Sequence, residues 1–335
     1  MLIGSDKMPR IKLHHLHAFI AIASEGSVHS AARVLGLAQP NLTKVLRELE
    51  EEMGISLVKR HAYGVDLTEA GQQLLTRATS ILEDLRRAQE EANELKGVHE
   101  GELTVGLSPT VQVMLLPTAY RQFAHDYPGV RLRVVEAKYP SVFQSLADGS
   151  MDFFIGENMG HSLDRRFEVS KWWSSELVVA VRNGHPLEGT TDLALLLDQR
   201  WLIMGYGTEV DDLLAKLFTA RGLRIPRGIT VLNSVLAFHV LSAYEDSDAL
   251  QLLPRPMIEL PCTIQRMRTV PLPLKAKIPG QDVLFIRRAG VPLTPLAERF
   301  AGLLHQAYRH HKVICANCRM SGSCTMPLPT PNRSH

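Results

Sequence analysis

The sequence contains no apolar run near the ~20 residues that a membrane-spanning helix needs, so we do not expect an integral membrane protein. Its N-terminus lacks a long apolar segment followed by a small-residue cleavage site, which argues against secretion. Cysteine is scarce, because the 335 residues contain four, of which Cys262 stands alone and three lie near the C-terminus. This is not the pattern of a disulfide framework, and we expect a cytoplasmic protein.

A strong excess of charge is also absent. The net charge is +2, so any case for nucleic acid must come from local pattern. Nucleophile elbows, phosphate-binding loops and His-Glu-x-x-His helices are missing, so we expect neither an enzyme nor a cofactor or metal. The composition, with 45% hydrophobic and 21% charged residues, is that of an ordinary globular protein, and the length predicts two or more domains.

The N-terminal region begins with two predicted helices. Apolar residues recur at helical spacing over 13–24, and Gly26 ends this first helix. Ser27 is suited to cap a second helix over 28–35, which ends at Gly36. Two short helices in succession, joined by glycine turns, are the start of a helix-turn-helix pattern.

A third helix and a hairpin complete this pattern. Gln39 lies at the predicted N-cap of the third helix, and Pro40 occupies its first helical position, where a missing N–H costs nothing. The segment 56–68 then predicts two short strands around a turn. Residues 1–67 are therefore predicted to form a winged helix-turn-helix domain.

The third helix has an apolar and a polar face. Amide and guanidinium groups near the start of a helix can read base edges in the major groove of DNA, and cationic side chains suit its phosphates. A polar face that only meets solvent is the alternative. The small pair Ala31–Ala32, the Gln-Pro start, the wing and the long helix that follows together favour DNA. The predicted DNA-binding residues are Ser27, Gln39, Pro40, Asn41, Thr43, Lys44, Arg47, Arg60 and His61.

Residues 68–96 predict a long helix that begins at the capping residue Thr68. Its apolar residues alternate spacings of 4 and 3, which is the heptad seam of a coiled coil. The alternative is a single amphipathic helix that lies on its own domain. A helix this long after a small domain has little else to bury against, so we expect a dimer. The seam consists of Leu74, Ala78, Ile81, Leu85, Ala88, Ala92 and Leu95.

Beyond a predicted hinge at 97–101, strands and helices alternate as in an α/β protein. The order repeats halfway, and the last strand and helix return to the first unit. We therefore expect two lobes with a cleft between them, a first over 102–171 and 276–312 and a second over 172–275.

Two strand-to-helix turns, GLSPTV and MGYGTEV, hold equivalent places in the two lobes. Each puts a hydroxyl beside a helix N-terminus, whose free N–H groups and dipole favour an anionic or oxygen-rich ligand. Ligands of open α/β sheets bind beyond the carboxyl ends of the strands, where these turns lie. The hydroxyls can also be simple helix caps, but two matching turns favour a ligand site. The predicted effector-binding residues are Ser108, Pro109, Thr110, Glu157, Tyr206, Gly207, Thr208, Asn233 and Ser234.

The class of ligand depends on few residues. Glu157 and Asn158 follow a strand, and a carboxylate beside an amide suits sugar hydroxyls while it repels an acid. Trp172 and Trp173 offer either a stacking face or core packing, of which core packing is the more frequent. We therefore favour a sugar over an aromatic acid.

The segment GSVHSAARVLGLAQPNLTKVLRELEEEMGISLVKRHAYGVDLTEAG resembles the N-terminal signature of LysR-type transcriptional regulators, and the resemblance extends to about residue 311. It implies a ligand-responsive regulator whose third helix enters the major groove and whose lobes resemble periplasmic binding proteins. It further implies a dimer of dimers on promoter DNA, with RNA polymerase as a partner if the protein activates. Within the family, the sequence resembles regulators that sense sugars, of the galactose-binding-protein regulator type, and regulators that sense aromatic acids or sulfonates.

Three residues depart from the family pattern. Asn41 and Thr43 stand where Ala and Ser are commoner, and Lys44 stands where Arg is frequent. These differences should change which operator is preferred.

The C-terminal tail has a second possible role. Cys315, Cys318 and Cys324, with two histidines upstream, can ligate metal, which would make the protein a metal- or thiol-responsive regulator. A structural zinc site normally needs two well-spaced pairs, and Pro and Ser dominate the last residues. We therefore expect a disordered tail over 313–335.

Overall fold

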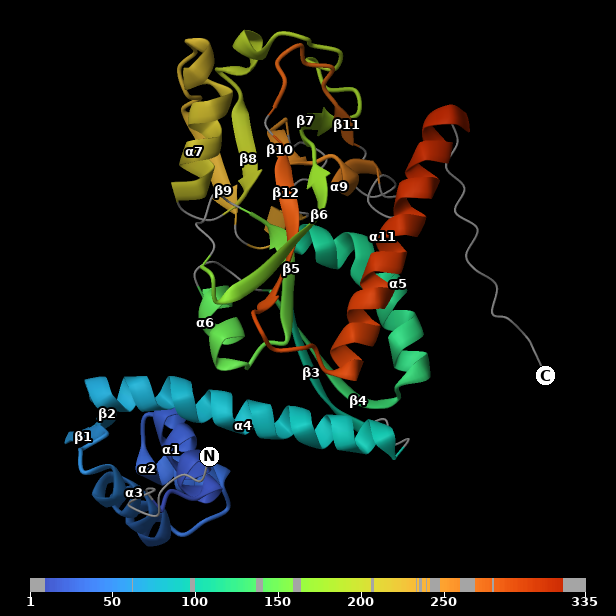
Figure 1. Cartoon of the computed structure of the whole chain (residues 1–335). Helices are drawn as coiled ribbons and strands as arrows, with labels where there is room; N and C mark the ends of the chain where they lie inside the picture. The colour runs from blue at the N-terminus through green and yellow to red at the C-terminus, as the bar shows by residue number, and fades with distance from the viewer. Residues whose placement is uncertain are drawn as a thin grey trace.

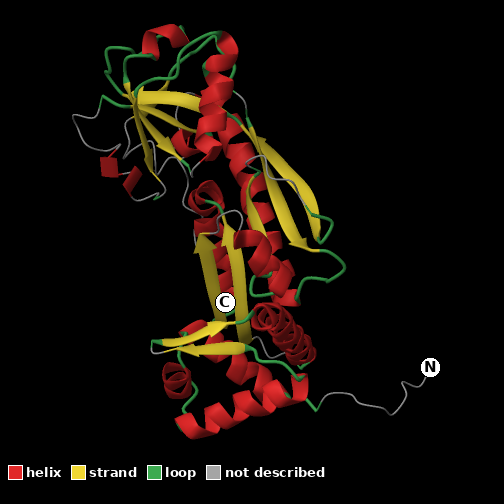
Figure 2. Cartoon of the chain, turned by 90° about the vertical axis from the view of Figure 1, so that its left-hand side faces the viewer, coloured by secondary structure: helices red, strands yellow, loops and turns green. Residues whose placement is uncertain are grey.

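The computed structural model describes residues 10–61, 63–96, 100–136, 141–158, 164–205, 208–232, 234, 237–238, 240–241, 248–259, 269–278 and 280–321. A small helical domain, one long helix and a two-lobed α/β region follow one another along the chain (Figure 1). The N-terminal hairpin and the second lobe lie at opposite ends of the molecule (Figure 2). Within these described ranges, no helix has both the length and the apolar character required to cross a membrane.

The N-terminal domain has the predicted winged helix-turn-helix architecture. Phe19, Leu42 and Leu46 are fully buried at its centre. The backbone N–H of Val65 donates to the carbonyl of Gly26 at 2.9 Å, which fixes the hairpin against the turn between the first two helices. The elements are α1 (Leu13–Glu25), α2 (Val28–Val34), α3 (Gln39–Met53), β1 (Val58–His61) and β2 (Gly64–Leu67).

The cap of α2 agrees with the sequence, whereas that of α3 differs. The Oγ atom of Ser27 accepts from the N–H of Ser30 at 3.5 Å and caps α2, as predicted. The predicted N-cap of α3 is wrong, because the extended residue before the helix is Ala38 and Gln39 is already helical. Pro40 is therefore the second helical residue, a position that also leaves no N–H unpaired.

The long helix α4 (Glu69–Leu95) begins as predicted, since Thr68 Oγ1 accepts from the N–H of Gly71 at 3.0 Å. The start of its seam is covered by the same chain, because Leu74 packs against the N-terminal core and Ala78 is fully buried. The rest of the seam is exposed in one copy of the chain. These exposed residues are Ile81, Leu85, Ala88, Ala92 and Leu95.

The first lobe is built on a five-stranded sheet in the order β4-β3-β5-β12-β6. Strand β3 is parallel to β4 and β5, whereas β12 is antiparallel to both of its neighbours. Helices α5 and α11 cover one face, and α6 covers the other. The strands are β3 (Glu100–Leu107), β4 (Gly129–Glu136), β5 (Phe153–Glu157), β6 (Phe167–Ser175) and β12 (Gln281–Arg288), and the helices are α5 (Pro109–Asp126), α6 (Ser141–Asp148) and α11 (Pro295–Ser321).

The second lobe has its own five-stranded sheet, in the order β11-β7-β10-β8-β9. Its core is centred on Trp201, whose ring packs edge-on against Phe218 at 5.4 Å between centroids. The strands are β7 (Leu177–Arg182), β8 (Arg200–Met204), β9 (Gly228–Leu232), β10 (Leu250–Pro254) and β11 (Thr269–Pro271). The helices are α7 (Thr208–Leu217) and α9 (Pro256–Glu259), with the short 3-10 turns η1 (Leu193–Leu196) and η2 (Thr219–Arg221).

The border between the lobes differs from the predicted one. Strand β6 pairs with β12 as far as Ser175, so the first lobe extends beyond the predicted boundary after residue 171. On the return path, Ala276 and Ile278 still pack in the core of the second lobe. Trp173, 7% exposed, stacks on Tyr308 of α11, so this tryptophan serves core packing.

The predicted disordered tail is wrong for its first residues. Helix α11 continues to Ser321, because the chain contains no glycine or proline between Gly302 and Gly322 to stop it. Cys324 and the side chains of Cys315 and Cys318 lie outside the described part of the chain. The metal and thiol alternative for the tail is therefore untested.

Candidate nucleic-acid interface and effector site

Helix α3 turns its apolar side chains inward and leaves its polar face open. Leu42, Leu46 and Leu49 are fully buried, whereas Lys44 and Arg47 are each 68% exposed. Gln39, Pro40 and Asn41 are exposed, and Thr43 and Ser27 are half-buried. The predicted DNA-binding residues on α3 thus form one accessible surface at and after the start of the helix.

The cations on this surface have weak internal partners. Lys44 Nζ lies 3.7 Å from Glu48, and Arg47 Nε lies 3.3 Å from Glu51, each one helical turn away. Exposed pairs of this kind contribute about 0.2–1 kcal/mol. Both cations can therefore leave their carboxylates for a phosphate at little cost.

The hairpin is held in a fixed position beside α3. Glu50 of α3 accepts hydrogen bonds from the backbone N–H groups of Leu57 at 2.7 Å and Val58 at 3.3 Å. This contact presents Arg60 and His61, both exposed, on the same domain as the polar face of α3. The wing is thus joined to α3 by two hydrogen bonds.

One residue of this surface was not predicted. His29, exposed on α2, lies with Nδ1 3.3 Å from Oε1 of Gln39, the first residue of α3. When Nδ1 carries its proton, it donates to that oxygen and leaves the Gln39 amide N–H groups facing outward. The sequence shows His29 as a polar residue of the second predicted helix, but it does not show that Gln39 is its partner.

In the first lobe, the predicted effector turn packs closely on the end of β5. Ser108 Oγ accepts from the N–H of Val111 at 3.4 Å and caps α5, so the capping role considered for this hydroxyl is confirmed. Ser108 also donates its backbone N–H to Ile155 at 2.9 Å, and Thr110 is 2% exposed. A Cβ at Gly156 would lie only 2.9 Å from that of Ser108, so glycine permits this contact.

The end of β5 carries buried acceptors. Glu157 is 9% exposed, and neither its Oε1 nor Asn158 Oδ1 has a hydrogen-bond partner among the described residues. Ser175 Oγ, at the crossover to the second lobe, is also buried and has no hydrogen-bond partner among the described residues. A buried acceptor without a donor costs about 1–3 kcal/mol, so these oxygens favour a ligand rich in donors.

The second-lobe half of the predicted site is largely outside the described residues. This holds for Tyr206, Gly207 and Asn233, and for the side chain of Thr208, at which α7 begins. Ser234 is exposed, and its Oγ accepts from the N–H of Ala237 at 3.3 Å. The effector role of these residues therefore stays a prediction.

Comparisons with known proteins agree with this division of the chain. Residues 13–72 match the family described as "Bacterial regulatory helix-turn-helix protein, lysR family", and residues 96–309 match "LysR substrate binding domain". The HTH-type transcriptional regulator GbpR of Azospirillum brasilense is 26% identical over 324 residues, which cover 96% of this chain and 91% of that regulator. The HTH-type transcriptional regulator TdcA of Escherichia coli is 28% identical over 302 residues, with 87% and 93% covered.

Solved structures show the same fold. Full-length OxyR from Pseudomonas aeruginosa has a TM-score of 0.63 at 21% identity, covering 90% of this chain and 95% of that chain. CbnR, a LysR family transcriptional regulator, has a TM-score of 0.58 at 20% identity, covering 89% and 99%. With a family match on the helix-turn-helix domain and another across both lobes, the chain belongs to the LysR family of DNA-binding, ligand-responsive transcriptional regulators.

Proposed function

We propose that this regulator binds promoter DNA through α3 and the wing, and that it acts in the cytoplasm. The observation that carries this proposal is the open polar face of α3, opposite an apolar face on which Leu42, Leu46 and Leu49 are fully buried. Gln39, Asn41 and Arg47 would reach base edges, and Lys44 would contact phosphate. Ser27, Pro40 and Thr43 would pack against the backbone of the same groove, and the wing would add phosphate contacts from Arg60 and His61.

We further propose that the protein assembles as a dimer of dimers, with α4 as the first interface. The seam residues Ile81, Leu85 and Leu95 are 49%, 45% and 91% exposed in one copy of the chain. They repeat at heptad spacing, so a second α4 would cover them in a coiled coil. A symmetric pair of recognition helices would then read two half-sites on one face of the duplex. If the protein activates, RNA polymerase would be a further partner.

The effector would bind between the lobes, beside Ser108, Pro109, Thr110 and Glu157. Buried acceptors there support a neutral ligand with many hydroxyl groups, because a carboxylate ligand would meet the carboxylate of Glu157. A sugar fits this chemistry better than an aromatic acid. Ligand binding would shift an equilibrium between two arrangements of the DNA-binding domains.

Selection of bound duplexes from a random DNA pool tests the DNA-binding part. We expect the full-length protein to enrich a pseudo-palindromic sequence whose half-sites lie about one helical turn apart or a multiple of it. Enrichment of no sequence above the starting pool would contradict the proposal.

Thermal unfolding of the full-length protein against neutral sugars and aromatic acids tests the effector part. A ligand at a hundredfold excess over its dissociation constant stabilises its site by about 2.7 kcal/mol. We expect the response to come from the sugars and to be lost in Thr110→Val, which removes a buried hydroxyl while it keeps the side-chain volume. A response to aromatic acids alone would show that Glu157 does not set the ligand class.

A further inference from the structure

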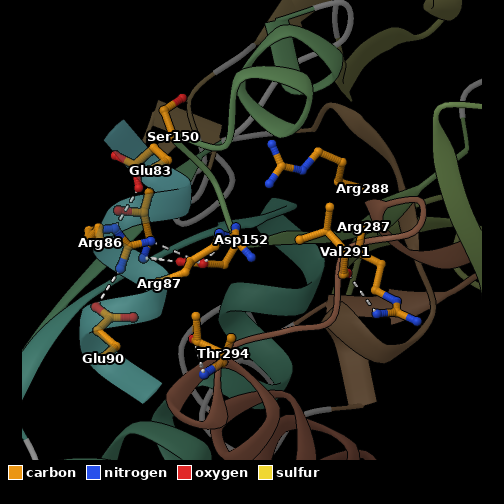
Figure 3. Close-up of polar contacts among 12 residues, drawn as sticks. Glu83, Arg86, Arg87, Glu90, Ser150, Asp152, Arg287, Arg288, Val291 and Thr294 are labelled. Atoms are coloured by element: carbon orange, nitrogen blue, oxygen red, sulfur yellow. Dashed lines mark hydrogen bonds and ion pairs between the residues drawn. The ribbon is translucent and has the colours of Figure 1, made fainter. Parts of the chain in front are cut away.

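Helix α4 meets the first lobe through a buried ion cluster (Figure 3). Asp152, the residue just before β5, has a side chain that is 1% exposed. Its Oδ1 lies 3.1 Å from Nη2 of Arg87 and 3.4 Å from Nη2 of Arg86, both on α4. Its Oδ2 accepts from the backbone N–H of Thr104 in β3 at 3.1 Å. One carboxylate therefore joins the linker helix to both β3 and β5.

Arg86 and Glu90 add a second link from α4 to β3. Arg86 Nη1 donates to the carbonyl of Glu102 at 2.8 Å, and Glu90 Oε1 accepts from the N–H of the same residue at 3.3 Å. Burial raises the pKa of Glu90, and the charge of Arg86 opposes this shift. Burial alone would lower the pKa of Arg86, but hydrogen bonding to Glu83 and the charge of Asp152 raise it above its ordinary value. The buried charges are thus held by one another.

A separate contact fixes the same helix nearer its start. Arg288 of β12 donates from Nη1 to Ser80 Oγ at 2.9 Å and pairs through Nη2 with Asp84. Gly149 lies so close to α4 that a Cβ there would be 3.1 Å from the Cβ of Glu83. The helix is therefore attached to the lobe at two points along its length.

The two strands tied to α4 lead to the candidate effector site. Strands β3 and β5 run parallel and side by side, with Val105 opposite Phe153 and Leu107 opposite Ile155. Beyond Leu107 comes the effector turn at Ser108, and β5 ends at Glu157. From Asp152 to Glu157 a strand spans about 17 Å. The ion cluster and the candidate effector site thus occupy opposite ends of one pair of strands.

We propose that Asp152 is the positioning residue that couples the effector site to the DNA-binding domain. A shift at the effector end of β3 and β5 moves the carboxylate, and the paired Arg86 and Arg87 make α4 follow. Close-packed sheets and helices transmit such small shifts instead of absorbing them. This inference rests on the proposed effector site and names the route by which that site acts.

A double-mutant cycle tests this coupling without a ligand. Gly156→Ala disturbs the effector end, because a Cβ there would lie 2.3 Å from the ring of Phe154 and 2.9 Å from the Cβ of Ser108. Asp152→Asn weakens the ion cluster and keeps the side-chain shape. The measured quantity is the dissociation constant of each full-length variant for the duplex that the wild-type protein selects from a random pool.

Gly156 and Asp152 lie about 13 Å apart along β5, a separation at which the effects of two mutations normally multiply. We expect Gly156→Ala to change the dissociation constant by at least about threefold alone and by less than about 1.5-fold in the Asp152→Asn background. If Gly156→Ala does not fold, Ser108→Ala, which removes the cap of α5, replaces it at the same end of the strands.

The matched control is Glu168→Gln, which breaks a 2.7 Å ion pair with Arg287 in the same lobe. We expect the effect of Gly156→Ala to be unchanged in this background. If Asp152 has a purely structural role, Asp152→Asn lowers the unfolding temperature but the effects of the two mutations on the dissociation constant still multiply, and this result overturns the inference. The inference also fails if the variant at the effector end does not change the dissociation constant. If the wild-type protein selects no DNA, the proposed function itself fails.

Discussion

Helices α3 and α4 are both amphipathic, but they use their faces in opposite ways. In α3 the apolar face is buried in its own domain and the polar face is open, with Lys44 and Arg47 each 68% exposed. In α4 the part of the polar face that meets the first lobe is covered, since Arg87 is 8% exposed and Glu90 is 6% exposed. Much of its apolar seam, including Leu85 at 45% exposed, is open in one copy of the chain.

This difference separates two kinds of surface. An open polar face on a rigid helix suits a charged partner from outside the chain, such as DNA. A buried polar face attaches one part of the chain to another. An exposed heptad seam suits pairing with a second copy of the helix. The same residue types would therefore bind a partner in α3, whereas in α4 they attach the helix to the first lobe.

The largest expected effect is on the free energy of unfolding, and it appears when an arginine is replaced by methionine on each of the two helices in turn. Arg87→Met leaves Asp152 without its nearest cation in a buried site, which should lower the free energy of unfolding by about 3 kcal/mol. Arg47→Met removes an exposed cation and should change it by no more than about 0.5 kcal/mol. Urea denaturation of the full-length variants measures both values, and equal losses would remove the distinction between the two polar faces.

A smaller effect is expected at the seam. Leu85→Glu places a charge where two copies of α4 would meet, and we expect at least about tenfold weaker self-association, with little change in the stability of each chain. Sedimentation over a range of protein concentrations measures this. Glu91→Lys, an exposed position on the same helix outside the seam, is the control. Wild-type assembly of Leu85→Glu would mean that another surface holds the oligomer together.

The smallest effect is expected at His29. Its contact with Gln39 fixes the orientation of that amide, so His29→Ala should weaken specific DNA binding by about 1 kcal/mol and alter the preferred base opposite Gln39. Parallel duplex selections with the wild type, His29→Ala and Gln39→Ala compare the preferences. Identical sequences from the wild type and His29→Ala would show that the contact does not matter for reading bases.

The N-terminal domain could be predicted almost entirely, because local signals define it. Ser27, Thr68 and the glycine turns fix helix ends within a few residues of chain. The predicted start of α3 was wrong by one residue, because a glutamine can be either the N-cap or the first helical residue. The backbone conformation, which the sequence does not show, places Gln39 inside the helix. Heptad spacing predicted the whole seam from Leu74 to Leu95, but not that Leu74 and Ala78 pack within the same chain.

The joint between α4 and the first lobe could not be predicted, because its partners are distant in sequence. Arg86 and Asp152 are separated by 66 residues, and the sequence shows Arg86 only as one of several charges beside the seam. The border between the lobes was misplaced for the same reason, since β6 pairs with β12 and joins Trp173 to Val283. In the candidate site, the sequence predicted that Ser108 lies at a strand-to-helix turn and that Glu157 follows a strand, but not that Ser108 packs on the end of β5 or that Glu157 is buried there.

The account depends most directly on α3 as the DNA-reading element. We would measure the affinity of the double variant Lys44→Ala and Arg47→Ala for the duplex that the wild-type protein selects, together with its thermal unfolding. Loss of two contacts to DNA predicts at least about tenfold weaker binding, with the lobes unfolding at the wild-type temperature. Unchanged affinity in a folded double variant would contradict the placement of the recognition helix and, with it, the proposed role of the whole N-terminal surface.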